Sequence, residues 1–122
     1  MFGKKKLPEL YSEREAETIE NHIAAHFGKF DNVIHEIISP DIHVDICVLD
    51  PTPARNYYTL ITTGMGAHRM NMPKELKKAG LDRAEVLIAL PPSWDLKSDD
   101  ERWYWPIRWL KILARLPGDY DT

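Results

Sequence analysis

The first clear pattern along the chain is a set of apolar residues at helical spacing. They recur at steps of three and four residues, as Ala16, Ile19, Ile23 and Phe27. Ser12 and Glu15 have the spacing of a capping box, which satisfies two free amides at a helix start. Gly28 is suited to ending the helix. The pattern predicts a helix over residues 13–27.

The next region alternates with a period of two. In residues 42–49, Ile42, Val44, Ile46 and Val48 alternate with His43, Asp45, Cys47 and Leu49. Such alternation predicts a strand whose successive side chains lie on opposite faces of a sheet. Runs of β-branched, aromatic and apolar residues predict further strands over 32–38, 56–63 and 83–90. The last run is nearly all apolar after Glu85, so a central position, buried on both faces, is expected for it.

Turn and cap residues separate these segments. Ser39-Pro40-Asp41 precedes the alternating strand, and Asp50-Pro51-Thr52-Pro53 follows it. Gly64-Met65-Gly66 ends the third strand, and its glycines are expected to allow positive φ and close backbone approach. Pro73 predicts the start of a short helix over 74–78.

A final helix is predicted from Pro106, a residue suited to the first helical turn, to Pro117-Gly118. Its apolar residues are Ile107, Trp109, Leu110, Ile112, Leu113, Ala114 and Leu116. Such a broadly apolar helix, with one narrow polar stripe, is expected to be deeply buried across the sheet. Short links between strands favour antiparallel neighbours. The fold class predicted is α+β, a mostly antiparallel sheet covered by helices, in a single domain over 1–122.

Composition limits the classes of partner. The chain has 122 residues and a net charge of −3, which disfavours general nucleic-acid binding. The basic run Lys4-Lys5-Lys6 is typical of a solvated tail. No run approaches the roughly 18 apolar residues of a spanning helix, and residues 1–10 lack the apolar core of a signal peptide. We therefore expect a cytoplasmic protein without membrane contact.

Six segments, in this order and spacing, resemble the suppressor-of-fused (Sufu-like) domain family. They are Asp41-Ile42-His43-Val44-Asp45-Ile46, residues 58–66, Met70-Asn71-Met72-Pro73, residues 84–91, Trp105-Pro106 and Leu113-Ala114-Arg115. The resemblance covers about residues 10–120, and the chain looks most like bacterial members. The family domain usually continues past Tyr120-Asp121-Thr122 with more sheet and loop. The resemblance therefore implies either a short member or one truncated at its C-terminus.

The resemblance also implies a function. Animal members restrain zinc-finger transcription factors of the Hedgehog pathway by gripping a short peptide as an added strand. Bacterial members are often found beside polymorphic toxins and are inferred to be immunity proteins. The expectation is a non-catalytic protein-binding module, with no cofactor, whose partner is another protein such as a toxin encoded nearby. The residues do not predict the oligomeric state.

Three regions are candidates for contact with that partner. The first is a sheet edge over 57–63, where Tyr57 and Tyr58 point to opposite faces and one should be exposed. The second is the loop over 64–72, which is either an adaptable contact surface or a packed loop; its candidates are Met65, His68, Arg69, Met70 and Asn71. The third is an acidic loop flanked by Trp94 and Trp103. Trp105 and Trp109 are expected in the core.

Catalytic and metal sites are weakly supported. His43, Asp45 and Cys47 share one strand face, but their side chains lie about 7 Å apart, which is wide for ligands of one metal ion. His22 and His26 are spaced i, i+4 but have no evident third ligand. Cys47 is expected to be a buried, inert thiol. No catalytic or metal-binding residue is therefore predicted.

Two alternatives to the binding module remain open. One is a hydrolase that uses Asp45 with His43 or His68, which predicts a polar cleft around those residues. The other is a structural piece of a larger multidomain protein, which predicts a large exposed apolar patch and self-association.

Overall fold

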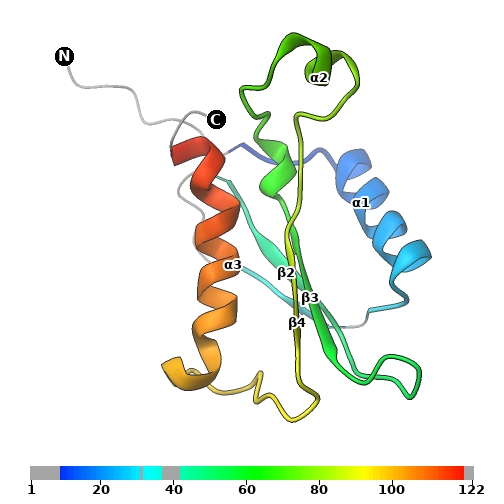
Figure 1. Cartoon of the computed structure of the whole chain (residues 1–122), viewed down its shortest axis with the longest axis vertical. Coiled ribbons are helices and arrows are strands. Elements are labelled where there is room, and N and C mark those ends of the chain that lie inside the picture. The colour runs from blue at the N-terminus through cyan, green and yellow to red at the C-terminus, as the bar shows by residue number, and fades with distance from the viewer. Residues whose placement is uncertain (1–8, 31, 37–41, 120–122) are drawn as a thin grey trace, which may run out of the picture.

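The computed structural model describes residues 9–30, 32–36 and 42–119. Along the chain the elements are α1 (Glu13–His26), β1 (Asn32–Ile34), β2 (Asp45–Leu49), β3 (Tyr58–Thr63), the 3-10 helix η1 (Met65–Ala67), α2 (Lys74–Lys78), β4 (Leu87–Leu90) and α3 (Glu101–Asp119). The strands form one sheet, with α1 and α3 on either side of it (Figure 1). The fold class is therefore α+β, as the sequence predicts.

The sheet has the order β1-β2-β3-β4, and each neighbouring pair is antiparallel. Cys47 of β2 lies opposite Ile61 of β3, and Tyr58 of β3 lies opposite Leu90 of β4. β3 is thus an interior strand, so the expected sheet edge over 57–63 is wrong. The strand predicted over 32–38 is described as β1, while Ile37, Ile38 and the turn at 39–41 lie outside the described residues.

β4 lies at an edge of the sheet, so the central position expected for residues 83–90 is wrong. The strand itself covers only Leu87–Leu90, and Leu87 is 49% exposed. Apolar side chains on both faces made this run look central. One face of β4 packs on the core, whereas the other borders an open cleft that is described below.

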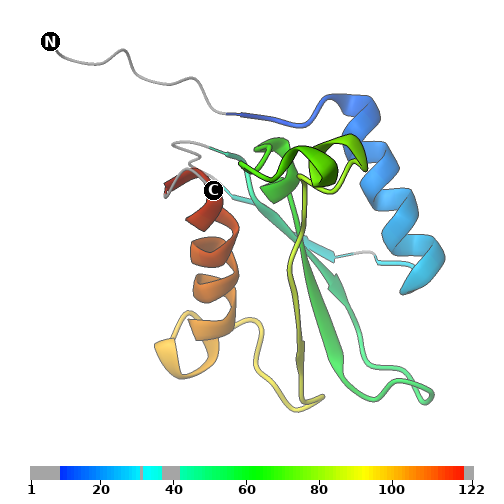
Figure 2. The same ribbon diagram turned by 45° about the horizontal axis from the view of Figure 1, so that its top comes forward.

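The alternation in β2 sorts its side chains between two cores, as predicted. Ile46 and Val48 belong to an α3-side cluster, completed by Leu60, Leu90, Ile107 and Leu110. Cys47 and Leu49 belong to an α1-side cluster, completed by Ile23 and Ile61. Figure 2 shows α1 and α3 on opposite sides of the sheet.

α1 has the predicted capping box, since Ser12 Oγ accepts from the amide of Glu15 and Glu15 Oε1 accepts from the amide of Ser12. Ile23 is its buried residue, and Ile19 and Phe27 pack half-buried beside it. At the other end, the Arg55 guanidinium donates to the carbonyl of Phe27. α1 therefore rests on β2 and β3 through a short apolar contact with polar contacts at both ends.

α3 begins earlier and ends later than predicted. Asp100 accepts a hydrogen bond from the amide of Arg102 at 3.0 Å, so the helix starts at Glu101 and Pro106 lies inside it. It continues past Pro117 to Asp119. The expectation that Trp105 and Trp109 lie in the core is wrong, because they are 40% and 52% exposed. The apolar surface of α3 is wider than the face that the sheet covers.

The short helix predicted over 74–78 is confirmed as α2. It stands at the end of the sheet where η1 lies (Figure 1). None of the helices formed by the described residues combines the length and hydropathy that crossing a bilayer requires.

Two leucines on neighbouring strands test this core. Leu60 is completely buried, whereas Leu87 is half exposed. We expect Leu60→Ala to lower the free energy of unfolding by about 2–5 kcal/mol, and Leu87→Ala to lower it by roughly 1 kcal/mol or less. Urea denaturation of both variants measures the difference. Equal losses would contradict the edge position of β4.

Candidate functional site

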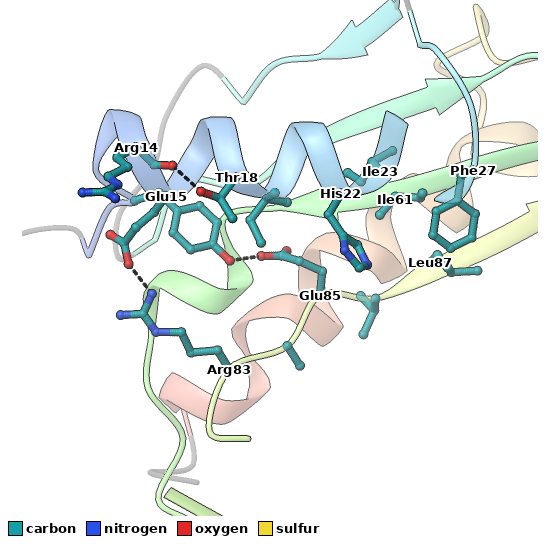
Figure 3. Close-up of a pocket in the computed structure, with 14 residues that line it drawn as sticks. Arg14, Glu15, Thr18, His22, Ile23, Phe27, Ile61, Arg83, Glu85 and Leu87 are labelled. Atoms are coloured by element: carbon teal, nitrogen blue, oxygen red, sulfur yellow. Dashed lines mark hydrogen bonds and ion pairs between the residues drawn. The ribbon is translucent and has the colours of Figure 1, made fainter. Parts of the chain in front are cut away.

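A cleft of about 540 Å³ lies between α1 and β4. Ile61 and Leu87 face it from the sheet, while Ile19, Ile23 and Phe27 line it from the helix. Figure 3 shows His22 and Phe27 reaching from α1 toward Leu87. The cleft exists because α1 packs on β2 and β3, which leaves the same face of β4 uncovered.

The cleft adjoins the outer edge of β4. Within the described part of the chain, β3 is the strand that pairs with β4, and none pairs with its outer side. An edge strand presents amides and carbonyls that can pair with an incoming strand. Residues Leu87 and Ala89 lie opposite Ile61 and Thr59, so they share the face that borders the cleft. The site therefore combines backbone hydrogen-bonding groups with an apolar surface.

The carboxylate of Glu85 closes one end of the cleft. It accepts from the Tyr11 hydroxyl, from Thr62 Oγ1 at 2.9 Å, and from the amides of Gly64, Met65 and Gly66 at 2.9–3.2 Å. The amides at the start of a helix have no intrahelical partner, so an anion beside them is stabilised. Glu85 thus joins the N-terminal segment, the end of β3 and η1.

Two glycines lie at this junction, and the predicted positive φ and close backbone approach are confirmed at Gly64 but not at Gly66. Gly64 has φ of +126°, and a Cβ there would lie 1.7 Å from the carbonyl oxygen of His43. A Cβ at Gly66 would lie 2.0 Å from the Tyr11 hydroxyl. Sequence reasoning missed Tyr11 and Glu85 themselves. The available signal in the sequence was Glu85 itself, a single carboxylate directly before the apolar residues 86–90.

An ion pair holds the start of α1 at the same end of the cleft. The Arg83 guanidinium donates to the Glu15 carboxylate (Figure 3). That hydrogen bond, followed by one from the Ser12 amide, lowers the pKa of Glu15 to about 2. Burial, and then the neighbouring Glu85, raises the pKa of Tyr11 well above its usual range. Tyr11 therefore stays protonated and donates to Glu85.

The candidate contact residues of the loop after β3 are partly packed. Met65 is buried in a cluster with Ile42, Val44 and Ala114. His68 is half-buried, with its Nδ1 2.9 Å from a Glu9 carboxylate oxygen. The Met70 amide donates to the carbonyl of Asp82, and Arg69 pairs with the Asp82 carboxylate. Arg69 and Asn71 are the exposed members of this group.

The aromatic candidates gather at the opposite end of the sheet. Tyr58 and Trp94 pack on the α3-side cluster, and Tyr57 is exposed. Trp94 Nε1 donates to the carbonyl of Trp103 at 2.9 Å, and the two rings meet edge to face. The structure therefore separates the predicted contact residues into two groups. Their contact with a partner stays a prediction.

Asp45 is surrounded by polar partners. Its Oδ1 lies 2.8 Å from His43 Nε2 and accepts from the Glu36 amide, while its Oδ2 lies 3.2 Å from His35 Nδ1. His43 and Asp45 line a second cleft of about 320 Å³, with Glu20 among its other residues. His43 and Asp45 therefore border a cleft, as the hydrolase alternative expects, but most of the surface that lines it is apolar. His68 contacts Glu9 instead.

No group of three or more His, Cys, Asp or Glu side chains among the described residues is arranged to hold a metal ion. The rings of His22 and His26 lie 4.3 Å apart on α1, where both residues are exposed.

Cys47 has the environment of an unreactive thiol. It is 2% exposed in the α1-side cluster. Burial, followed by the negative charges of Glu20 and Asp45, raises its pKa to about 12. The thiolate is the nucleophilic form of cysteine, so Cys47 is not a nucleophile near neutral pH.

A thiol-labelling experiment tests this environment. Cys47 is the single cysteine of the chain, so the signal belongs to one residue. At pH 8 we expect slow labelling of the native protein and rapid labelling in urea. Because the folded pKa is raised, the protonated thiol contributes stability below about pH 9 that is lost as the pH rises toward 12. Rapid labelling of the native protein would contradict the burial of Cys47 in the α1-side cluster.

A charge-neutral substitution tests the Glu85 junction. In Glu85→Gln, an amide NH₂ replaces one of two oxygens that each accept hydrogen bonds. We expect a loss of about 2–4 kcal/mol in the free energy of unfolding, because buried donors lose their acceptor. Glu75→Gln on the exposed face of α2 is the matched control and should change stability by less than about 0.5 kcal/mol. Equal losses of stability in Glu85→Gln and Glu75→Gln would contradict the role of Glu85 in holding this junction together.

The comparisons with known proteins agree with the resemblance seen in the sequence. The model of the family described as Suppressor of fused protein matches residues 40–122, well over half of the chain. The matched region contains β2, β3, β4 and α3, whereas α1 precedes it. The comparisons with curated proteins and with solved structures found no match. This chain belongs to the suppressor of fused family.

Proposed function

We propose that this chain is a non-catalytic protein-binding module, and that a partner adds an extended segment along the outer side of β4. The observation that carries the proposal is an apolar cleft directly beside the outer edge of β4, with which no described strand pairs. Backbone pairing along an edge supplies affinity, and pockets for alternate side chains supply specificity.

The shape of the cleft limits the segment that it can accept. β4 has four residues, so an added strand of similar length sends about two side chains toward α1. Each large apolar side chain that becomes fully buried there contributes about 1.5–3 kcal/mol. The contacts of Tyr11 with Glu85 and of Arg83 with Glu15 block one end. The segment therefore extends from that end toward Phe27.

The proposed biological role is immunity in a bacterial cytoplasm, where the partner is a toxin encoded nearby. The support is the likeness of the sequence to bacterial members of the family. Both regulation and immunity need a stoichiometric binder, so the same surface serves either role. Tyr57, Arg69 and Asn71 are the exposed candidates outside the cleft and remain proposed secondary contacts.

The contacts of Asp45 favour a structural role over the hydrolase alternative. Its two oxygens hold His35, His43 and the Glu36 amide together at the start of β2. A general base must also reach a substrate proton. The Asp45 carboxylate already has three contacts, so it is better suited to fixing the start of β2 than to acting as a general base.

The test begins with the full chain, tagged and expressed in its own host. We expect one protein to co-purify at a near one-to-one ratio. Leu87→Arg, which places a charge in the cleft beside the β4 edge, should weaken that complex about tenfold or more. Leu81→Arg is the matched control, because Leu81 is exposed to a similar extent (57% against 49% for Leu87) but lies outside the cleft.

Three outcomes decide the proposal. Loss of the complex in Leu87→Arg but not in Leu81→Arg supports it, provided that both variants unfold at the wild-type temperature. A complex that survives Leu87→Arg would place the contact elsewhere. If no protein co-purifies and the chain is monodisperse, the binding role itself is contradicted. For the immunity role, the partner alone should stop growth, and co-expression of this chain should restore it.

A further inference from the structure

The outer face of α3 carries an apolar seam that the fold does not cover. Trp105, Trp109 and Ile112 are exposed, and Leu116 is half-buried. Exposed Leu113 lies beside them. The opposite face of the helix packs on the core through Pro106, Ile107, Leu110, Ala114 and Pro117. α3 lies on the other side of the sheet from α1, so this seam is separate from the cleft (Figure 1).

The spacing of the seam is typical of contact with another helix. Residues 105, 109, 112 and 116 follow one another at steps of four, three and four, which is the a/d spacing of a heptad. A strict a/d stripe is narrow and matches the groove of a facing helix. Helices that lie on a bilayer bury a wider apolar face. Here the rest of the apolar surface of α3, apart from exposed Leu113, is packed on the sheet, which leaves a stripe widened at one position only.

The charges beside the seam indicate the chemistry of that helix. Arg102 lies one turn before Trp105, and Arg108 and Lys111 line a shallow groove together with Ile112 of the seam. Arg108 pairs with Glu101. Arg102 and Lys111 form no ion pair with any residue that the structure describes. The groove beside Ile112 therefore carries excess positive charge, whereas the acidic residues Asp99, Asp100 and Glu101 lie at the N-terminal end of the helix. A second copy of the chain would bring the same positive flank against itself, whereas acidic residues would complement it.

We propose that the seam of α3 docks an amphipathic helix of a partner protein, with an apolar a/d stripe and acidic flanking residues. This inference does not rest on strand addition at β4. It assigns a second contact surface to the molecule, on the opposite side of the sheet.

The experiment uses two synthetic helical peptides of about three heptads with Leu at a and d. One peptide carries Glu at its flanking positions and the other carries Lys at the same positions. Each is titrated against the full chain by fluorescence anisotropy and by the emission of the chain's tryptophans. We expect the Glu peptide to bind at least tenfold more tightly and to shift the emission of Trp105 and Trp109 to shorter wavelength.

Variants of the chain show which surface and which charges are responsible. Trp109→Glu should abolish binding, and Leu87→Arg in the cleft should leave it unchanged. Trp109 is half exposed, so its variant should fold, as the thermal unfolding temperature will check. The double variant Arg102→Glu with Lys111→Glu keeps the seam and should reverse the preference in favour of the Lys peptide.

Four results would overturn the proposal. The first is absence of binding, and the second is equal affinity for the two peptides. The third is self-association in sedimentation that Trp109→Glu abolishes, which would assign the face to a second copy, as the alternative of a structural piece expects. The fourth is binding to phosphatidylglycerol vesicles that Trp109→Glu abolishes, which would assign the face to a membrane.

Discussion

The shape of this molecule depends on the carboxylate of Glu85. It lies just before β4 and accepts hydrogen bonds from the N-terminal segment, from β3 and from three successive amides at η1. Anionic acceptors form hydrogen bonds roughly twice as strong as neutral ones. One side chain therefore connects segments that are far apart in the sequence. With the pairing of Arg83 and Glu15, it determines where α1 stands relative to β4.

The position of α1 in turn creates the cleft. The helix covers β2 and β3 through Ile19, Ile23 and Phe27 but does not reach across β4. The edge strand is left with one apolar face open and its outer backbone unpaired by any described strand. On the other side of the sheet, α3 also keeps an exposed apolar surface, because the sheet covers only part of the apolar side chains of this helix. Two exposed apolar surfaces thus follow from incomplete coverage of one small sheet.

Local patterns in the sequence predicted much of the fold. The capping box and the spacing of Ile19 and Ile23 predicted α1, and strict alternation predicted the two-faced burial of β2. These features depend on neighbouring residues. The edge position of β4 was not predictable in the same way, because strand order depends on pairing between distant segments. The exposure of Trp109 was missed because periodicity reports which residues are apolar, but not what covers them.

The candidate site shows the same limit. The partners of Glu85 lie 19 to 74 residues away in the sequence, so no local motif brings them together. Gly64 was recognised as a position of close backbone approach, but the His43 carbonyl that approaches it was not, and the side chain of Tyr11 beside Gly66 was not predicted. The aromatic candidates Trp94 and Trp103 were found from composition, yet they pack together at the end of the sheet opposite η1.

Amide hydrogen exchange, measured on the free chain and on its co-purified complex, shows whether a partner strand adds to β4. We expect amides on the outer side of β4 to exchange rapidly in the free chain and to become protected in the complex, together with residues of α1 that line the cleft. Protection confined to other surfaces, with β4 exchanging as it does in the free chain, would contradict strand addition beside the cleft.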